Sequence, residues 1–161
     1  MTTAVDTATA QTTEATTIPV TLRERIPDTT QGSYAGVPAT IIKVGTEVLN
    51  EQRWCASPNQ EYVFIFQADG NLVQYQVIGA PGPLNPGVTF NGKALWSSGT
   101  INPKRGRKFV VQNDGNLVIY DENQKDVWSS NTAGTPGGLY VQDDSNIVLY
   151  KLVYSWATIR P

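Results

Sequence analysis

The chain of 161 residues has no histidine, a single cysteine and few charged residues. Without histidine, neither a Ser-His nor a Cys-His nucleophilic pair can form, which argues against the hydrolases that depend on one. The lone cysteine, Cys55, excludes an internal disulfide, so the core alone must stabilise the fold. No apolar run is long enough to cross a membrane, and membrane insertion is therefore not expected.

Charge is scarce and nearly balanced. Residues 1–40 hold four acidic and two basic residues, which accounts for the net charge of −2, and the remaining ten of each sign cancel. A neutral body is not expected to attract nucleic acid over long distances. The one basic run, from Lys104 to Lys108, has no interleaved aromatic residues and is interpreted as a solvated loop.

A nine-residue pattern, Q-x-D-x-N-x-V-x-Y, occurs three times with identical spacing. The three repeats consist of Gln67, Asp69, Asn71, Val73 and Tyr75; Gln112, Asp114, Asn116, Val118 and Tyr120; and Gln142, Asp144, Asn146, Val148 and Tyr150. An internal repeat of this fidelity predicts one supersecondary unit used three times, and hence a fold with approximate threefold symmetry.

Each repeat has the pattern of a β-hairpin. Runs of β-branched and aromatic residues precede the motif, at 62–66 and 109–111, and predict a strand that leads into it. The Asp-Gly that follows suits a short loop in which glycine takes a positive φ. The third repeat has Ser145 at the glycine position, which predicts a strained turn.

The strand that leads out of each loop separates two sets of residues. Its motif positions share one face because side chains alternate, and the positions between them form an apolar core face with Gln74 as the polar exception. If these amides, acids and phenols were buried, each would need a hydrogen-bond partner in the core, three times over. The motif residues are therefore predicted to face outward. For the aspartates alone, the alternative that they cap their own turns stays open.

The motif offers donors, acceptors and one small apolar patch, a combination that suits a sugar. The triple Q-x-D-x-N-x-V-x-Y pattern resembles the bulb-type mannose-specific lectins of the snowdrop kind. The resemblance implies an all-β fold of the β-prism II type, with three four-stranded antiparallel sheets, over residues 41–161. It also implies that Gln, Asp and Asn of each repeat hold the 2-hydroxyl region of mannose, Tyr the 4-hydroxyl and Val the ring carbons, with no metal or other cofactor.

Tryptophans with small polar followers come after the repeats, at Trp96, Trp128 and Trp156. The resemblance implies that they meet near the prism axis, and we interpret them, like Trp54, as packing residues. Twenty residues separate Tyr75 from Trp96, against seven and five in the later repeats. This turn-rich insertion is predicted to cover or extend the first site, which is expected to deviate most.

Residues 1–40 form a Thr/Ala-rich arm that lacks the features of a secretory signal peptide. Its composition favours disorder; the alternative is docking on a neighbouring subunit by strand addition, with 18–22 as the anchor. The resemblance also allows a dimer formed through the C-terminal strand.

The sequence therefore predicts a protein that is not an enzyme and binds mannose-type glycans without a metal. A glycosidase is disfavoured because no second acid recurs at a fixed spacing, and an EF-hand because its twelfth-position glutamate is missing. The alternative hypothesis is a structural or adhesive subunit of a larger assembly that docks through the N-terminal arm.

Overall fold

The computed structural model describes residues 16–101, 106–134 and 137–151, and in these ranges every regular element is a β-strand. The strands are β1 (Ile18–Thr21), β2 (Thr29–Tyr34), β3 (Val37–Ile42), β4 (Glu47–Leu49), β5 (Arg53–Ala56), β6 (Tyr62–Phe66), β7 (Leu72–Gly79), β8 (Thr89–Ser97), β9 (Lys108–Val111), β10 (Leu117–Tyr120), β11 (Asp126–Ser129), β12 (Gly138–Gln142) and β13 (Ile147–Tyr150).

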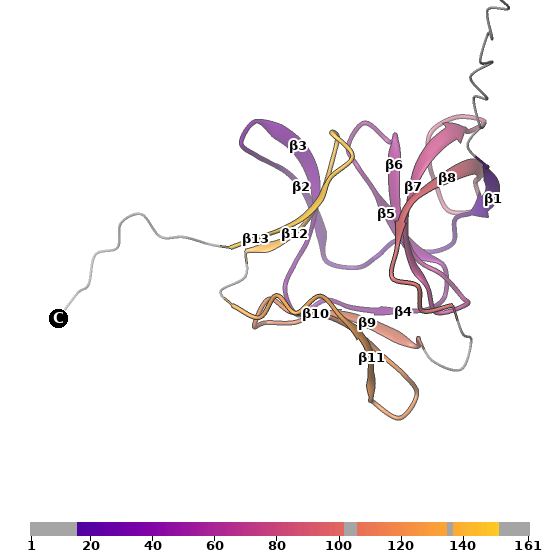
Figure 1. The fold of residues 1–161 in the computed structure, drawn as a ribbon. Helices are drawn as coiled ribbons and strands as arrows, with labels where there is room; N and C mark the ends of the chain where they lie inside the picture. The colour runs from indigo at the N-terminus through magenta and orange to yellow at the C-terminus, as the bar shows by residue number, and fades with distance from the viewer. Residues whose placement is uncertain (1–15, 102–105, 135–136, 152–161) are drawn as a thin grey trace, which may run out of the picture.

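These strands form three antiparallel sheets around a common centre (Figure 1). The first sheet has the order β1-β8-β7-β6-β5, the second β11-β10-β9-β4 and the third β13-β12-β3-β2. The predicted arrangement of three sheets is confirmed. One sheet differs from the expected four strands, because β1 adds a fifth strand to the first sheet.

Each repeat forms the hairpin that its pattern predicts. The hairpins are β6–β7, β9–β10 and β12–β13. Gly70 and Gly115 in their turns have φ of 85° and 86°, and Ser145 takes φ of 73° at the same place. The third repeat therefore keeps the left-handed turn at the cost of a strained serine backbone.

In the described part of the N-terminal region, residues 16–40, three segments belong to β-strands. The domain boundary placed at residue 40 falls inside β3, which pairs with β12, while β2 forms the outer edge of the same sheet. Strand addition does occur at the expected place, but on the same chain, because β1 pairs with β8 and sets Val20 opposite Phe90. β8 is nine residues long, and β1 covers part of the edge that β8 would otherwise leave unpaired.

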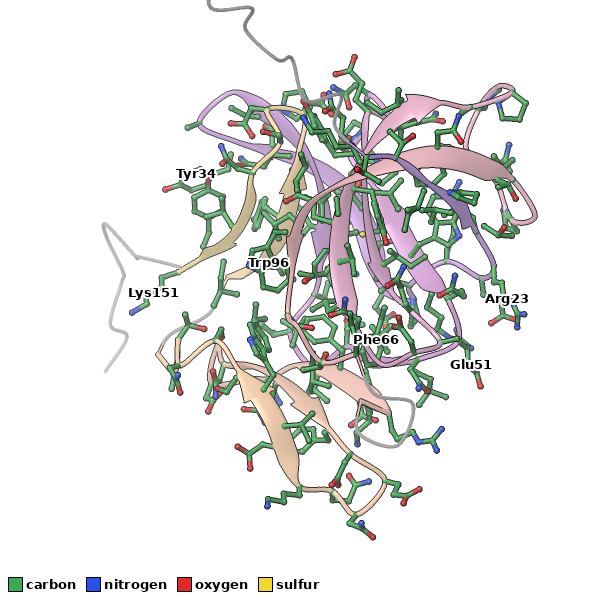
Figure 2. The ribbon with its side chains drawn as sticks, turned by 45° about the vertical axis from the view of Figure 1, so that its right-hand side comes forward. Arg23, Tyr34, Glu51, Phe66, Trp96 and Lys151 are labelled. Atoms are coloured by element: carbon green, nitrogen blue, oxygen red, sulfur yellow. The ribbon has the colours of Figure 1, made fainter. Side chains whose placement is uncertain are left out.

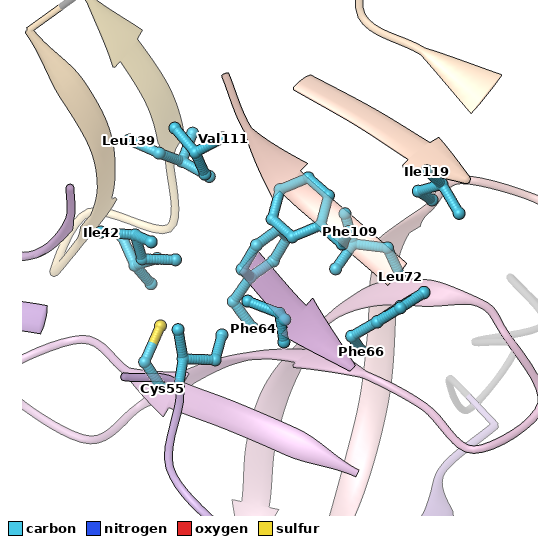
Figure 3. Close-up of a cluster of buried hydrophobic side chains, with 12 residues drawn as sticks. Ile42, Cys55, Phe64, Phe66, Leu72, Phe109, Val111, Ile119 and Leu139 are labelled. Carbon is cyan, nitrogen blue, oxygen red and sulfur yellow. The ribbon is translucent and has the colours of Figure 1, made fainter. Parts of the chain in front are cut away.

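The main core lies where the inner faces of the sheets meet. Phe64 and Phe66 of β6 pack against Phe109 of β9, with ring centroids 6.0 and 6.3 Å apart (Figure 3). Leu72 and Ile119, from the core-facing positions of the first two repeats, belong to the same cluster. Trp96 and Trp128 meet edge to face at 5.8 Å, but only Trp128 packs against this cluster. Trp96 is 41% exposed, so the prediction of a core position is wrong for it. Trp156 lies outside the described residues.

Two exceptions to the repeat pattern contact each other across this core. The side-chain amide of Gln74, buried on the inner face of β7, donates a hydrogen bond to the carbonyl oxygen of Ser145 at 2.7 Å. The one polar residue on the expected core face thus has the partner that burial requires. It ties the first sheet to the strained turn of the third repeat.

A second hydrophobic cluster covers the outer face of the first sheet. Val20 and Leu22 enter it from the N-terminal region, Leu84 from the insertion loop at 79–87 and Phe90 from β8. Beneath them lie residues of β5, β6 and β7, among them the fully buried Trp54. Packing was the predicted role of Trp54. The second and third sheets contribute no residue to this cluster.

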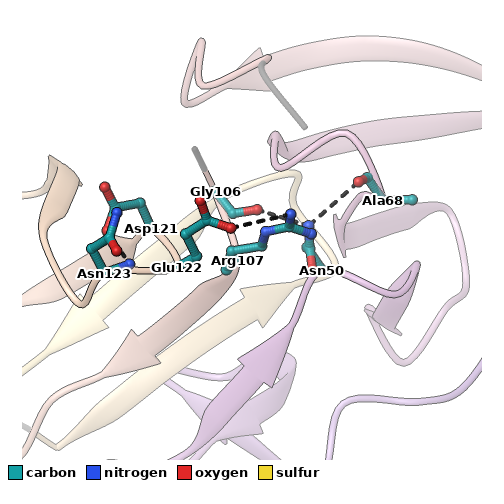
Figure 4. A network of polar contacts seen from close by, with 7 residues as sticks. All are labelled: Asn50, Ala68, Gly106, Arg107, Asp121, Glu122 and Asn123. Carbon is teal, nitrogen blue, oxygen red and sulfur yellow. Dashed lines mark hydrogen bonds and ion pairs between the residues drawn. The ribbon is translucent and has the colours of Figure 1, made fainter. Parts of the chain in front are cut away.

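The first two repeats are joined by close backbone packing. A Cβ on Gly70 would lie 2.7 Å from the carbonyl oxygen of Gly106, so both positions need glycine. Asn50 donates to the carbonyl oxygens of Gly106 and Ala68, at 2.8 and 3.4 Å (Figure 4). The neighbouring Arg107 forms a surface ion pair with Glu122 at 3.7 Å. Lys108, the last residue of the basic run, pairs with Glu47 and already belongs to β9, while residues 102–105 lie outside the described ranges.

Candidate functional site

The glutamine and the tyrosine of each repeat lie side by side, although eight residues separate them. Gln67 Nε2 donates to the Tyr75 hydroxyl at 2.9 Å, and Gln112 makes the same bond to Tyr120. In the third repeat the direction is reversed, and the Tyr150 hydroxyl donates to Gln142 Oε1 at 3.4 Å. The hairpin brings these groups together because the glutamine lies at the end of its first strand and the tyrosine lies on its second strand.

Each motif aspartate caps its own turn. One oxygen, Oδ1, of Asp69, Asp114 and Asp144 accepts a hydrogen bond from the backbone N–H of the following motif asparagine, at 2.9, 2.9 and 3.0 Å. The turn-capping interpretation left open for aspartate is therefore correct for Oδ1. Oδ2 of each carboxylate makes no hydrogen bond to any described residue, and it stays available as an acceptor.

The motif asparagines are oriented by residues that follow the tryptophans. Asn71 Oδ1 accepts from the Thr100 backbone N–H at 3.2 Å, and Asn116 Oδ1 accepts from that of Thr132 at 3.2 Å. Ser98 and Ser130 add hydroxyl bonds to the same oxygens. Because Oδ1 is held, Nδ2 stays a free donor within the described part of the chain.

Sequence reasoning missed these positioning residues. Ser98, Thr100, Ser130 and Thr132 belong to the Trp-Ser-Ser-x-Thr segments, which were interpreted only as small polar followers of core tryptophans. The recurrence of Ser and Thr at fixed distances after two of the tryptophans was the available signal. The matching residues after Trp156 lie outside the described ranges.

The first repeat is closed by its own chain. Asn71, Val73 and Tyr75 expose only 4%, 2% and 3% of their surface, so the outward exposure predicted for them is wrong. Tyr75 packs edge to face on Phe90 at 6.4 Å, and Val20 comes so close that a Cβ on Gly92 would meet both side chains at 2.8 Å. Gln67 and Asp69 remain half-buried beside Arg23 and Gln52, at a shallow hollow.

The second repeat is the open one. Asp114 is exposed, and Gln112, Asn116 and Tyr120 are half-buried. Val118 is buried, so the outward exposure predicted for it is wrong, as it is for Val73. The ammonium of Lys108 lies 5.8 Å from the centroid of the Tyr120 ring and also pairs with Glu47 at 3.3 Å. Free donors and acceptors thus converge on an accessible face.

The third repeat is accessible at its turn and has an added aromatic neighbour. Asp144 and Asn146 are exposed, Val148 and Tyr150 are half-buried, and Gln142 is buried. Tyr34, from the end of β2, stacks on Tyr150 with ring centroids 3.4 Å apart (Figure 2 labels Tyr34). Nothing in the motif pointed to Tyr34, because its approach depends on how β2 joins the third sheet.

The phenol of Tyr75 has a perturbed pKa. Burial raises the pKa of Tyr75, the hydrogen bond from Gln67 opposes this rise, and the charge of Asp69 adds to it. Among the described residues, no group of three or more acidic or cysteine side chains is placed to hold a metal ion. Those residues also contain no helix with the length and apolar character needed to span a membrane.

Comparison with known proteins gives relatives of one kind. No family model matches the chain. A mannose-specific lectin from Aloe arborescens is 32% identical over 111 residues, which cover 67% of this chain and 87% of the relative. A mannose-specific lectin from Galanthus nivalis is 36% identical over 72 residues, which cover 44% of this chain and 45% of that relative.

Solved structures agree with these relatives. The mannose-specific agglutinin from snowdrop (Galanthus nivalis) bulbs, complexed with methyl-α-D-mannoside, superimposes with a TM-score of 0.54 at 30% identity, over 73% of this chain and 94% of that one. A mannose-specific lectin from Dutch crocus (Crocus vernus) gives a TM-score of 0.53 at 21% identity, over 74% and 94% of the two chains, and is similar in fold.

Proposed function

Because the chain belongs to the family of monocot mannose-specific lectins, we propose that it binds mannose-containing glycans reversibly, without a metal and without chemical turnover. The observation that carries the proposal is the second repeat, where an accessible face combines a free carboxylate oxygen, a free amide donor and a phenol. Hydroxyl groups both donate and accept, so this set matches a sugar edge.

In the second repeat, Gln112, Asp114 and Asn116 hold the 2-hydroxyl region of mannose. Asp114 Oδ2 accepts and Asn116 Nδ2 donates, since their other polar atoms are bound within the protein. Tyr120 contacts the 4-hydroxyl, and Val118 lies under the ring carbons. An epimer with the 2-hydroxyl reversed would leave these groups unpaired, which gives the site its selectivity.

The third repeat is a second site with an altered wall. Its residues Asp144, Asn146, Val148 and Tyr150 take the corresponding roles, and Tyr34 adds an aromatic face beside the phenol. We propose that the first repeat does not bind sugar in the intact chain, because Asn71 and Tyr75 are buried. Each open site is weak for a monosaccharide, on the order of millimolar, and useful affinity comes from several sites on one branched glycan.

We also propose that the molecule dimerises through its C-terminal strand. In the first and second sheets, the strand that carries the tryptophan pairs with the motif strand. Trp96 of β8 lies opposite Gln74, and Trp128 of β11 lies opposite Ile119. Among the described residues, β13 of the third sheet has no partner on that side. Removal of residues 152–161 should convert the dimer to a monomer in light scattering, and an unchanged mass would contradict the proposal.

An assembly subunit that docks through the N-terminal region is not favoured, since β1 pairs with β8 of its own chain. The function is tested by retention on immobilised mannose and by calorimetry with methyl α-mannoside. We expect elution by the free glycoside and no effect of a chelator. A protein that passes through the column unretained, with native structure, would refute the proposal.

The chain supplies a matched pair of variants for assigning the sites. Asp114→Asn keeps the Oδ1 acceptor that caps the turn but replaces Oδ2 with a donor, so the second site should weaken by about tenfold with the fold intact. Asp69→Asn makes the same change in the closed first repeat and should leave affinity unchanged. Equal effects of the two variants would contradict the assignment.

A further inference from the structure

A cavity of about 260 Å³ lies away from all three repeats. Its walls come from the segment after β1, from the β2–β3 hairpin, from β5 and from the insertion loop that carries Leu84. No residue of the Q-x-D-x-N-x-V-x-Y motif lines it. The space is large enough for one small polar molecule, and its chemistry differs from that of the motif sites.

The guanidinium of Arg25, a solvent-exposed residue in the wall of this cavity, is held in place. The Arg25 Cζ lies 4.3 Å from the centroid of the Trp54 ring, and Nη2 donates to the Leu84 carbonyl oxygen at 3.1 Å. Trp54 is fully buried and fixed by its own hydrogen bond to the Arg23 carbonyl oxygen at 3.0 Å. Across the described ranges, Arg25 has no ion pair with a carboxylate, so most of its donors are free.

The remaining polar side chains that line the cavity are neutral, and two exposed glutamines among them are each fixed at one end. Gln31 Nε2 donates to the Thr40 hydroxyl at 3.0 Å, and Gln60 Oε1 accepts from the Leu84 N–H at 2.7 Å. Gln31 Oε1 and Gln60 Nε2 make no hydrogen bond within the described part of the chain. None of the lining residues is acidic.

We propose that this cavity is a second ligand site, which binds a small polyol that carries a carboxylate or phosphate group, such as an acidic sugar or a sugar phosphate. The oxyanion pairs with the guanidinium of Arg25, whose planar fork matches two oxygens at once. The two glutamine amides bind the hydroxyls. Unlike the motif sites, this site selects for negative charge.

The test is calorimetric titration of the full chain with glucuronate, glucose 6-phosphate and neutral glucose. We expect saturable binding of at least one of the two anions, about tenfold tighter than that of glucose. Preference for glucuronate assigns a carboxylate ligand, and preference for the phosphate ester assigns a phosphate ligand. Equal binding of glucose and both anions, or no binding of either anion, would overturn the proposal.

Two arginines near each other supply the matched control. Arg25→Gln should reduce anion binding about tenfold, whereas Arg23→Gln, whose side chain projects from the surface outside the cavity (Figure 2), should leave it unchanged. Equal losses in both variants would indicate non-specific attraction and would overturn the proposal. Retained binding of methyl α-mannoside by both variants separates this result from any failure of the mannose sites.

A further variant covers the case in which Arg25→Gln disturbs the fold. Thr30, at the exposed rim of the cavity, makes no hydrogen bond through its side chain among the described residues. Thr30→Asp places a carboxylate in the cavity without removing any contact of Arg25. It should abolish anion binding by repulsion while the unfolding temperature stays near that of the wild type. Undiminished anion binding in this variant would overturn the proposal.

Discussion

The first and second repeats have the same five residues, the same spacing and nearly the same local hydrogen bonds, but only the second is open. In both, the glutamine bonds the tyrosine, the aspartate caps the turn and the asparagine is held by a Trp-Ser-Ser-x-Thr segment. The difference lies outside the motif, in β1 and the insertion, which cover one repeat with apolar side chains. A motif therefore determines the geometry of a site, and distant segments determine its access.

The largest effect should come from removing the cover of the first repeat. Phe90→Ala takes a fully buried ring out of the second cluster and should lower the free energy of unfolding by about 3–5 kcal/mol, measured by urea denaturation. Ile78→Ala, at an exposed position of β7, is the control and should have little effect. A loss for Phe90→Ala no larger than that of the control would show that the cover adds no stability.

Overpacking the same cover should have a smaller effect. Gly92→Ala places a methyl group 2.8 Å from both Tyr75 and Val20, and it should cost about 1–3 kcal/mol in the same assay. Gly79→Ala is the matched control, because a Cβ at this position would lie 3.5 Å from its nearest neighbour, Nδ2 of Asn91. A tolerated Gly92→Ala would mean that β1 moves aside readily, and calorimetry should then detect a third mannose site.

The closed repeat should make stability sensitive to alkali. The pKa of Tyr75 is raised above its ordinary value of 10.0, so the unfolded chain loses this proton first. The contribution of Tyr75 to stability should be intact below pH 10 and should fall as the pH rises toward the folded value, by at most about 1.4 kcal/mol per pH unit.

Cys55 adds to this alkaline loss, since burial raises its thiol pKa from 9.0 to about 12, an effect that the nearby Arg25 charge opposes. Comparing unfolding curves of the wild type and Tyr75→Phe over this range isolates the tyrosine. Parallel pH profiles of the two proteins would show that Tyr75 titrates normally.

The smallest effect concerns the turn of the third repeat. Ser145→Gly relieves a left-handed backbone at φ 73° and gives the third turn the residue found in the other two, so it should stabilise the fold by about 1 kcal/mol. The bond from Gln74 reaches the backbone carbonyl of residue 145 and is retained. Destabilisation in thermal unfolding would show that the serine side chain has a role of its own.

Much of the fold follows from local pattern. The hairpins, the turn conformations at Gly70, Gly115 and Ser145, and the two faces of the motif strands depend on residues close in sequence. Gln74 and Ser145 both stood out as exceptions, but their contact did not, because it joins two sheets. The pairing of β1 with β8 could likewise not be predicted, since the sequence near Ile18 suits any unpaired strand edge.

The amino-acid sequence by itself determined the threefold repeat, the three hairpins and the constellation of amide, acid, amide and phenol in each, because alternation and turn chemistry act over a few residues. Tertiary structure alone decided which constellation meets solvent. The burial of Tyr75 depends on Val20, Leu22 and Phe90, which arrive from distant segments. Apolar association is non-directional, so no local pattern specifies where they settle.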